Sequence, residues 1–168
     1  NLDPLGNCTN GIERINSVQT YMGNDYSKLH GWPRSKYLNV WVVAKMMNGV
    51  AGYAYYPGSV DVLGNFNFPN RDGVIILQDY IGTIGTGSGF KSRALTHEIG
   101  HYLNLKHVWG DNNNPGVACG DDNVDDTPIT KGWDHCPTPA TAMICTPGVV
   151  ENYQNYMEYS YCDNMFTF

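Results

Sequence analysis

Hydrophobic residues recur at three- and four-residue steps in two segments of the chain. This spacing predicts an amphipathic helix over Thr9–Met22 and a second helix from about Phe90 to Leu103. Thr86 or Ser88, in the glycine-rich loop before the second segment, is the expected N-cap. The apolar positions of the two stripes are Ile12, Ile15, Val18 and Met22, and Leu95, Ile99, Tyr102 and Leu103.

Three apolar runs between these helices predict β-strands. Tyr37–Ala44 is almost continuously apolar, which is typical of a largely buried strand. Gly49–Tyr56 and Asp72–Leu77 are bounded by residues that favour turns. Periodicity is lost after Trp109, where Asn, Gly and Pro are frequent. The chain is therefore expected to form strands and helices first and a long irregular region second.

The balance of charged and apolar residues limits what the protein can bind. The 168 residues include 10 Lys and Arg against 16 Asp and Glu, a formal charge of −6, and 42% are hydrophobic. This composition excludes a disordered chain, and the absence of a basic cluster argues against a nucleic-acid partner. No apolar run approaches the roughly 20 residues that span a bilayer. We expect a single domain with no membrane span.

The cysteines indicate an oxidising compartment. Cys8 stands apart, whereas Cys119, Cys136, Cys145 and Cys162 lie in the last third of the chain. Four cysteines allow three pairings, and the spacing does not choose between them. No Cys-x-x-Cys pair is present, which disfavours a cysteine zinc site. The pattern predicts two disulfides in a secreted protein, and because no signal peptide is visible, a secreted chain would be a processed form.

The second predicted helix carries a metal-binding pattern. His97 and His101 are one turn apart, so both imidazoles project from one face and can reach one zinc ion. Glu98 can act as a general base on a zinc-bound water. His107 can reach the same ion only if the chain bends back, which needs a residue that tolerates a positive φ, and Asn104 is such a residue. The segment predicts a catalytic zinc site.

Other interpretations of this pattern stay open at the level of sequence. The zinc could be structural, for which Cys8 is the one unassigned fourth ligand, or zinc and calcium could stabilise a binding or adhesion domain without turnover. Ordinary helix histidines are a poor explanation, because three His and a Glu at fixed offsets occur in a chain with only 5 His. His30 and His135 are expected to be surface or loop histidines.

Several segments outside the zinc motif extend the pattern. They are Asp72–Leu77, the loop Thr83–Gly89, Val108–Asp111, Asp121–Pro128 and Asn155–Tyr159. With the zinc motif, these segments resemble the pappalysin family of metzincin zinc peptidases from about residue 35 to the C-terminus. The resemblance implies a metzincin-like α/β fold: a twisted, mostly parallel sheet with an antiparallel edge strand, an N-terminal helix, the active-site helix and an irregular C-terminal subdomain. It implies one catalytic domain over residues 1–168, in which residues 1–107 form an upper region and residues 108–168 a lower region.

The same resemblance implies catalytic roles. Met157 would lie in the Met-containing turn beneath the histidines, and Tyr159 would stabilise the tetrahedral intermediate. Glu98 would take the proton of the water and return it to the leaving amine. Val74–Leu77 resembles the exposed upper-rim edge strand, which would bind extended protein or peptide substrates by strand addition. The expected activity is that of a secreted zinc endopeptidase.

The acidic segment Asp111–Asp126 is an expected calcium-binding site. Five Asp lie between Asp111 and Asp126 with no basic residue, and calcium would offset their repulsion. The family implies a structural calcium held by the side chains of Asp122 and Thr127 and a carbonyl near Val124 or Asp125. It also implies crossed disulfides, with Cys8 left without an assigned partner. The expected bridges are Cys119–Cys145 and Cys136–Cys162.

One departure from the family pattern affects specificity. Bacterial pappalysins that prefer Arg or Lys after the scissile bond have a longer acidic stretch at this point, whereas Tyr159–Cys162 is short and contains no acid. Asp163 lies just beyond Cys162. Because the acidic stretch is shorter here, the resemblance does not imply a preference for Arg or Lys in this chain. Met165–Phe168 ends where such domains usually continue, which predicts a processed or truncated product. A removed propeptide and a monomeric enzyme are also expected.

Overall fold

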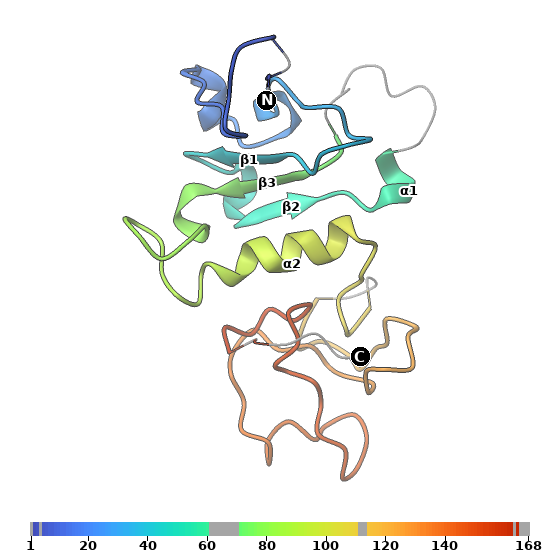
Figure 1. Cartoon of the computed structure of the whole chain (residues 1–168). Helices are drawn as coiled ribbons and strands as arrows, with labels where there is room; N and C mark the ends of the chain where they lie inside the picture. Colours follow the sequence, from blue (N-terminus) through green and yellow to red (C-terminus); the bar gives the residue numbers. More distant parts are fainter. Residues whose placement is uncertain (1, 4, 61–70, 111–113, 163, 165–168) are drawn as a thin grey trace.

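The computed structural model describes residues 2–3, 5–60, 71–110, 114–162 and 164. The strands are β1 (Val40–Val43), β2 (Gly52–Ala54) and β3 (Val74–Leu77), and the α-helices are α1 (Pro57–Val60) and α2 (Arg93–Tyr102). Short 3-10 helices are η1 (Val18–Tyr21), η2 (Asp25–Ser27), η3 (Met47–Gly49) and η4 (Gln78–Tyr80). Figure 1 shows the sheet above α2 and the irregular lower region beneath that helix.

The central strand of the sheet is β3. The strand order is β1-β3-β2, with β1 parallel and β2 antiparallel to β3. A sheet with an antiparallel edge strand is thus confirmed, but that edge is β2, and the prediction that Val74–Leu77 is an exposed edge is wrong. The side chains of Val74, Ile75 and Ile76 are fully buried. Gly73 allows β3 to begin close to β1, because a Cβ at Gly73 would lie 2.4 Å from the backbone oxygen of Asn39, the residue before β1.

The strand β1 is buried on one face only. Val40 is 39% and Val42 is 48% exposed, whereas Val43 is buried and packs with Ile75 of β3. The predicted strand over Tyr37–Ala44 is therefore shorter and less buried than expected. Side chains alternate along a strand, and only the face that carries Trp41 and Val43 packs on the core.

The predicted helix over Thr9–Met22 is wrong for most of its length, and only the single turn η1 forms. The Gly11 N–H donates to Thr9 Oγ1, and the next amide donates to Asn10 Oδ1. Such side-chain bonds compete with helical hydrogen bonds. Val18 remains 83% exposed, so the apolar stripe packs against no core. Without that packing a short helix is unstable in water, and the N-terminal helix of the expected fold is reduced to one turn.

The helix α2 begins three residues later than predicted, and its buried face is polar. Ser92 takes the N-cap position instead of Thr86 or Ser88, and no side-chain capping bond forms. α2 packs against β2 and β3. Leu103, expected in the apolar stripe, is 64% exposed. The buried residues of α2 are His97, Glu98, Gly100 and His101. Within the described ranges, no helix has the length and apolar character needed to cross a membrane.

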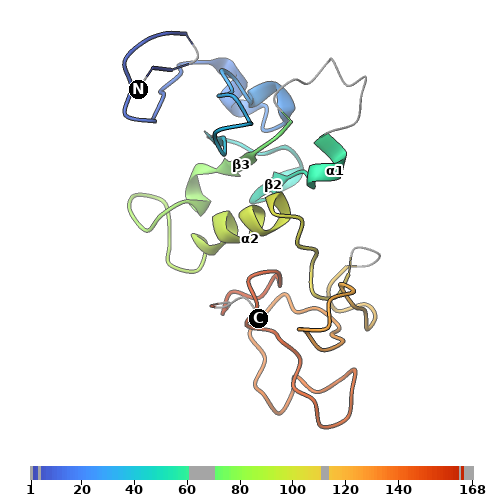
Figure 2. The same ribbon diagram turned by 45° about the vertical axis from the view of Figure 1, so that its right-hand side comes forward.

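Disulfides and buried polar contacts hold the lower region together. Its described residues form no helix or strand beyond one isolated bridge pair, and Figure 2 shows its loops below α2 from a second angle. Cys119–Cys145 and Cys136–Cys162 are both formed, with Cα–Cα distances of 5.7 and 5.6 Å, which confirms the expected pairing. Cys8 is exposed and free.

Candidate active site

The end of α2 turns the chain back towards its own buried face. Asn104 has a φ of +73°, and its N–H donates to the His101 carbonyl at 2.9 Å. The Leu105 N–H donates to the Gly100 carbonyl, also at 2.9 Å. These two bonds form the Schellman motif, which ends a helix at a left-handed residue. The predicted bend at Asn104 is confirmed, and it returns the chain so that His107 lies beside α2.

Three imidazoles converge at this bend. The candidate ligand atoms of His97, His101 and His107 all lie within 4.8 Å of one another, and the Nε2 atoms of His101 and His107 are 3.1 Å apart. His97 Nδ1 bonds to the Tyr156 carbonyl at 2.7 Å, and His101 Nδ1 bonds to the Leu105 carbonyl at 2.8 Å. Carbonyl acceptors fix these Nδ1 atoms as donors, which leaves each Nε2 lone pair for a metal.

Burial keeps His97 and His107 neutral. Burial, and then the neighbouring His101, together lower the pKa of His97 to about 4. Burial likewise lowers the pKa of His107 to about 3, with contributions from the two other histidines. The His107 ring stacks on Trp109 at a centroid distance of 4.5 Å and an interplanar angle of 7°. Three converging imidazoles, with Nδ1 of His97 and His101 bonded to carbonyls, are a donor set that suits zinc.

The Glu98 carboxyl lies beside this cluster at the sheet edge. It is 8% exposed, and burial raises its pKa to about 7, against the opposing effect of a hydrogen bond from the backbone of Ala54 in β2. Glu98 and His97 line a cavity of about 440 Å³. Its other walls are residues 50–52, the N-terminal half of α2, Tyr80 and residues 158–161. The cavity gives an incoming chain access to the carboxyl and to His97 together.

Tyr159 and Met157 approach the histidines from the lower region. The Tyr159 ring lies 5.5 Å from the His97 ring and 4.9 Å from the His107 ring, measured between centroids. Burial, and then the charge of Glu98, raise the pKa of the Tyr159 phenol, so that it keeps its proton. Met157 is 2% exposed and packs against Gly100 of α2. Both residues therefore lie beside the histidine cluster, the position that the family resemblance implied for them.

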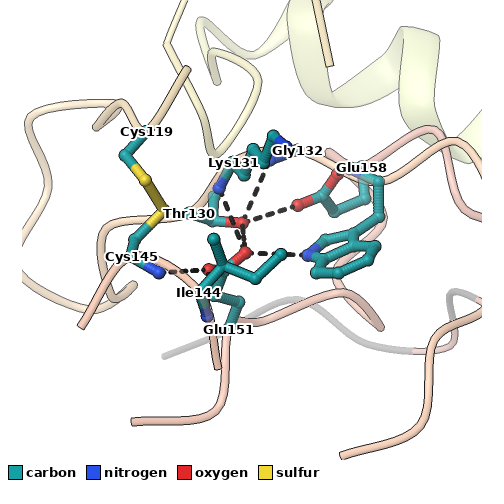
Figure 3. Close-up of a disulfide and its surroundings, with 9 residues drawn as sticks. Cys119, Thr130, Lys131, Gly132, Ile144, Cys145, Glu151 and Glu158 are labelled. Atoms are coloured by element: carbon teal, nitrogen blue, oxygen red, sulfur yellow. Dashed lines mark hydrogen bonds between the residues drawn. A yellow bond between two sulfur atoms is a disulfide. The ribbon is translucent and has the colours of Figure 1, made fainter. Parts of the chain in front are cut away.

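A buried network of polar side chains beneath the site was not predicted. Glu151 and Glu158 are 1% and 2% exposed, and Thr130 lies between them with its hydroxyl within hydrogen-bond distance of both carboxyls. Figure 3 shows the three side chains together with the Cys119–Cys145 disulfide. The sequence did contain one indication of this network. Glu158 is an acidic residue within the aromatic segment Asn155–Tyr159, and a carboxyl buried there needs hydrogen-bonding partners.

The acidic segment is only partly assembled around the expected calcium ligands. Asp122 Oδ1 accepts hydrogen bonds from the Thr127 hydroxyl at 3.1 Å and from the Val124 N–H at 3.0 Å. Burial raises the pKa of Asp122. Asp125 is exposed, and Asp111 lies outside the described residues. Asp163 and Met165–Phe168, on which other expectations rest, are also outside them.

The remaining histidines and Cys8 lie apart from the three-histidine cluster. His30 and His135 are exposed and pair with Glu13 and Asp134 at 2.6 and 2.7 Å, as expected for surface residues. Across the described stretches of the chain, the group of potential metal ligands contains three histidines and no cysteine. This gives no support to Cys8 as a fourth ligand.

The fold and the three-histidine cluster together define a metzincin-like peptidase domain. The chain belongs to the peptidase M43 family, described as pregnancy-associated plasma protein-A, which is the pappalysin family and matches residues 20–168.

Two fungal relatives match most of the chain. An extracellular metalloprotease of Arthroderma benhamiae is 31% identical over 169 residues, covering 94% of this chain and 53% of the relative. Extracellular metalloprotease 1 of Coccidioides posadasii is 31% identical over 159 residues, covering 91% and 54%. The chain thus spans about half the length of these relatives.

Solved structures share the fold. Mature mirolysin of Tannerella forsythia, in complex with a cleaved peptide, has a TM-score of 0.82 and 34% identity over 99% of this chain and 64% of its own. A mutant of Tannerella forsythia promirolysin has a TM-score of 0.81 and 34% identity over 99% and 56%. The metzincin-like α/β architecture predicted from the sequence is confirmed.

Proposed function

We propose that this chain is the catalytic domain of a secreted zinc endopeptidase that hydrolyses extended protein segments. The observation that carries the proposal is the convergence of three imidazoles beside the buried Glu98 carboxyl, which lines a cavity together with His97. Residues 1–168 would act as a single domain, as a monomer, with the lower region (residues 108–168) completing the site. The names of the fungal relatives and the paired cysteines support an extracellular location.

His97, His101 and His107 would hold the zinc through Nε2. When bound, zinc supplies a Lewis acid that lowers the pKa of water and polarises a peptide carbonyl. Glu98 would take a proton from the attacking water on its carboxylate and transfer it to the leaving amine. The Tyr159 hydroxyl would donate a hydrogen bond to the oxyanion that develops on the carbonyl. Each side chain lies at one wall of the same cavity or contacts a histidine of the cluster.

The substrate would bind along β2. This strand is the edge of the described sheet next to α2 and the cavity, so a substrate in extended conformation can pair with it through backbone hydrogen bonds. The cleaved peptide named in the mirolysin complex is consistent with peptide binding in this family. A propeptide would be removed before activity, which the naming of a promirolysin supports.

A structural calcium would stabilise the acidic segment. The Thr127 hydroxyl lies within hydrogen-bond distance of Asp122 Oδ1, and both side chains have oxygen atoms that can bind calcium. Carbonyls near Val124 or Asp125 would complete the set. Met157 would form the hydrophobic floor of the zinc site, packed against α2.

Digestion of casein by the parent chain and by Glu98→Ala tests the proposal. We expect the parent to cleave casein and the variant to lose at least about 100-fold in rate, because it lacks the proton acceptor. Metal analysis should find zinc in both proteins. An unchanged rate in the variant would refute the mechanism, and a zinc-loaded parent that cleaves nothing would favour a non-catalytic binding domain instead.

A further inference from the structure

Four consecutive residues, Tyr156 to Tyr159, support the histidine cluster in different ways. The Tyr156 carbonyl accepts the hydrogen bond from His97 Nδ1. The Met157 thioether packs against α2, and the Tyr159 ring faces the histidines. The Glu158 side chain instead bonds to Thr130 and to the Trp133 amide in the lower region. Glu158 is thus the residue of this turn that connects the floor of the site to the subdomain beneath it.

Glu158 is connected through Thr130 to Glu151, whose carboxylate accepts five hydrogen bonds. The Oε1 atom of Glu151 accepts from two backbone amides, and Oε2 accepts from a hydroxyl, an indole N–H and a third amide. The donors are Ile144 N, Cys145 N, Thr130 Oγ1, Trp133 Nε1 and Lys131 N, at 2.8–3.1 Å. Both oxygens of Glu151 face only donors in this set, so the group is charged.

The single hydroxyl proton of Thr130 determines the state of Glu158. Thr130 Oγ1 lies 2.9 Å from Glu151 Oε2 and 3.4 Å from Glu158 Oε1, and it also accepts the Gly132 N–H. Its one proton goes to the closer, charged oxygen of Glu151. The contact with Glu158 is then a hydrogen bond only if Glu158 Oε1 carries a proton and donates.

The second oxygen of Glu158 fits the same assignment. Oε2 accepts the Trp133 N–H at 2.7 Å and needs no proton. The Glu151 and Glu158 side chains are both buried, 1% and 2% exposed, and two adjacent buried carboxyls are not both charged without cost, which favours the neutral form of Glu158. The order of donation is therefore Glu158 to Thr130 to Glu151.

We infer that Glu158 is a positioning residue: as a neutral carboxylic acid, joined through Thr130 to Glu151, it fixes the turn Tyr156–Tyr159 beneath the histidines. The inference rests on the proposed zinc site, because its effect passes through the Tyr156 carbonyl to His97 and through Tyr159 to the cavity. The Glu158 carboxyl bonds to Thr130 and to the Trp133 amide in the lower region, and not to the histidines. Its contribution is to hold the groups that contact the histidines.

Competition with a chelator measures the consequence for zinc binding without any need for catalysis. Glu158→Gln should bind zinc within about 3-fold of the parent, because an amide can donate to Thr130 and accept from Trp133 as the acid does. Glu158→Ala should bind zinc about 10-fold or more weakly, as loss of outer support for a ligating histidine does. Glu13→Gln, a change at the surface pair with His30, is the matched control and should leave zinc binding unchanged.

Kinetics on casein-derived peptides give a second readout. Glu158→Ala should lower kcat with little change in KM, since β2 and the substrate edge are untouched, and Glu158→Gln should restore kcat. Glu151→Gln should not behave like Glu158→Gln, because an amide nitrogen at either position would face N–H donors. The zinc affinity of Glu151→Gln should therefore fall, as that of Glu158→Ala does.

Two results would overturn the inference. A folded Glu158→Ala protein with parental zinc affinity would show that Glu158 is only structural, and equal losses in Glu158→Gln and Glu158→Ala would exclude a neutral acid. If Glu158→Ala does not fold, Thr130→Val decides: weaker zinc binding supports the connection, and parental binding refutes it. A parent chain that binds no zinc would instead refute the proposed function, so the two failures are distinguishable.

Discussion

A methyl group at position 100 of α2 should destabilise the domain through its contact with Met157. A Cβ at Gly100 would lie 2.3 Å from Met157 Sδ and 3.2 Å from its Cε. Met157 is 2% exposed and has little room to move. Overpacking costs about 1–3 kcal/mol, whereas Ala gains about 1 kcal/mol over Gly within a helix. The difference of these two effects leaves a loss of up to about 2 kcal/mol in the free energy of unfolding of Gly100→Ala.

A double-mutant cycle isolates this contact. Met157→Ala alone should cost about 2–5 kcal/mol by opening a cavity, and in that background Gly100→Ala should be neutral or stabilising, because its methyl fills some of the space. Denaturant unfolding of the four proteins should give a coupling energy of about 1–3 kcal/mol. Gly89→Ala is the control, since a Cβ there meets nothing within 4 Å. Additive effects of the two substitutions would refute the packing account.

Three further predictions concern the site. Tyr159→Phe should lower kcat about 100-fold with little change in KM, as loss of an oxyanion donor does; an unchanged kcat in a peptide assay would exclude that role. Asn104→Ala should lower stability by about 1 kcal/mol in thermal unfolding, because Ala resists a φ of +73°, whereas Asn104→Gly should not; equal losses would contradict this. In the metal-free domain, protonation of His97 should lower stability as pH falls from 6.5 towards about 4, since His97 has a pKa of about 4 when folded and the unfolded chain binds the proton first. The raised pKa values of Glu98 and Glu158 act in the opposite direction, so the melting temperature of the parent is compared with that of His97→Gln; a difference between the two proteins that stays constant across this range would show that burial does not control His97.

Features set by neighbours in the sequence were predictable. One helical turn separates His97 from His101, and the left-handed tolerance of Asn104 places the bend that brings in His107. These are properties of local backbone geometry. The crossed disulfides came from the family resemblance, because spacing alone left three pairings open.

Features that depend on contacts between distant segments were not predictable. The apolar stripe that includes Val18 looked helical, but it had no surface to pack against, and local bonds at Thr9 and Asn10 replaced the helix. Nothing in the apolar run Val74–Leu77 shows that a strand lies on each side of it. Thr130 and Glu158 are 28 residues apart, so local sequence patterns could not indicate their shared hydrogen bond.

Diffraction from crystals of the zinc-loaded chain at the zinc absorption edge tests the central claim most directly. The account predicts one anomalous peak about 2.0–2.1 Å from the Nε2 atoms of His97, His101 and His107. It also predicts no fourth protein ligand, with Glu98 close by but not bound to the metal. A peak elsewhere, or a fourth side chain such as that of Cys8 on the metal, would contradict a catalytic three-histidine site.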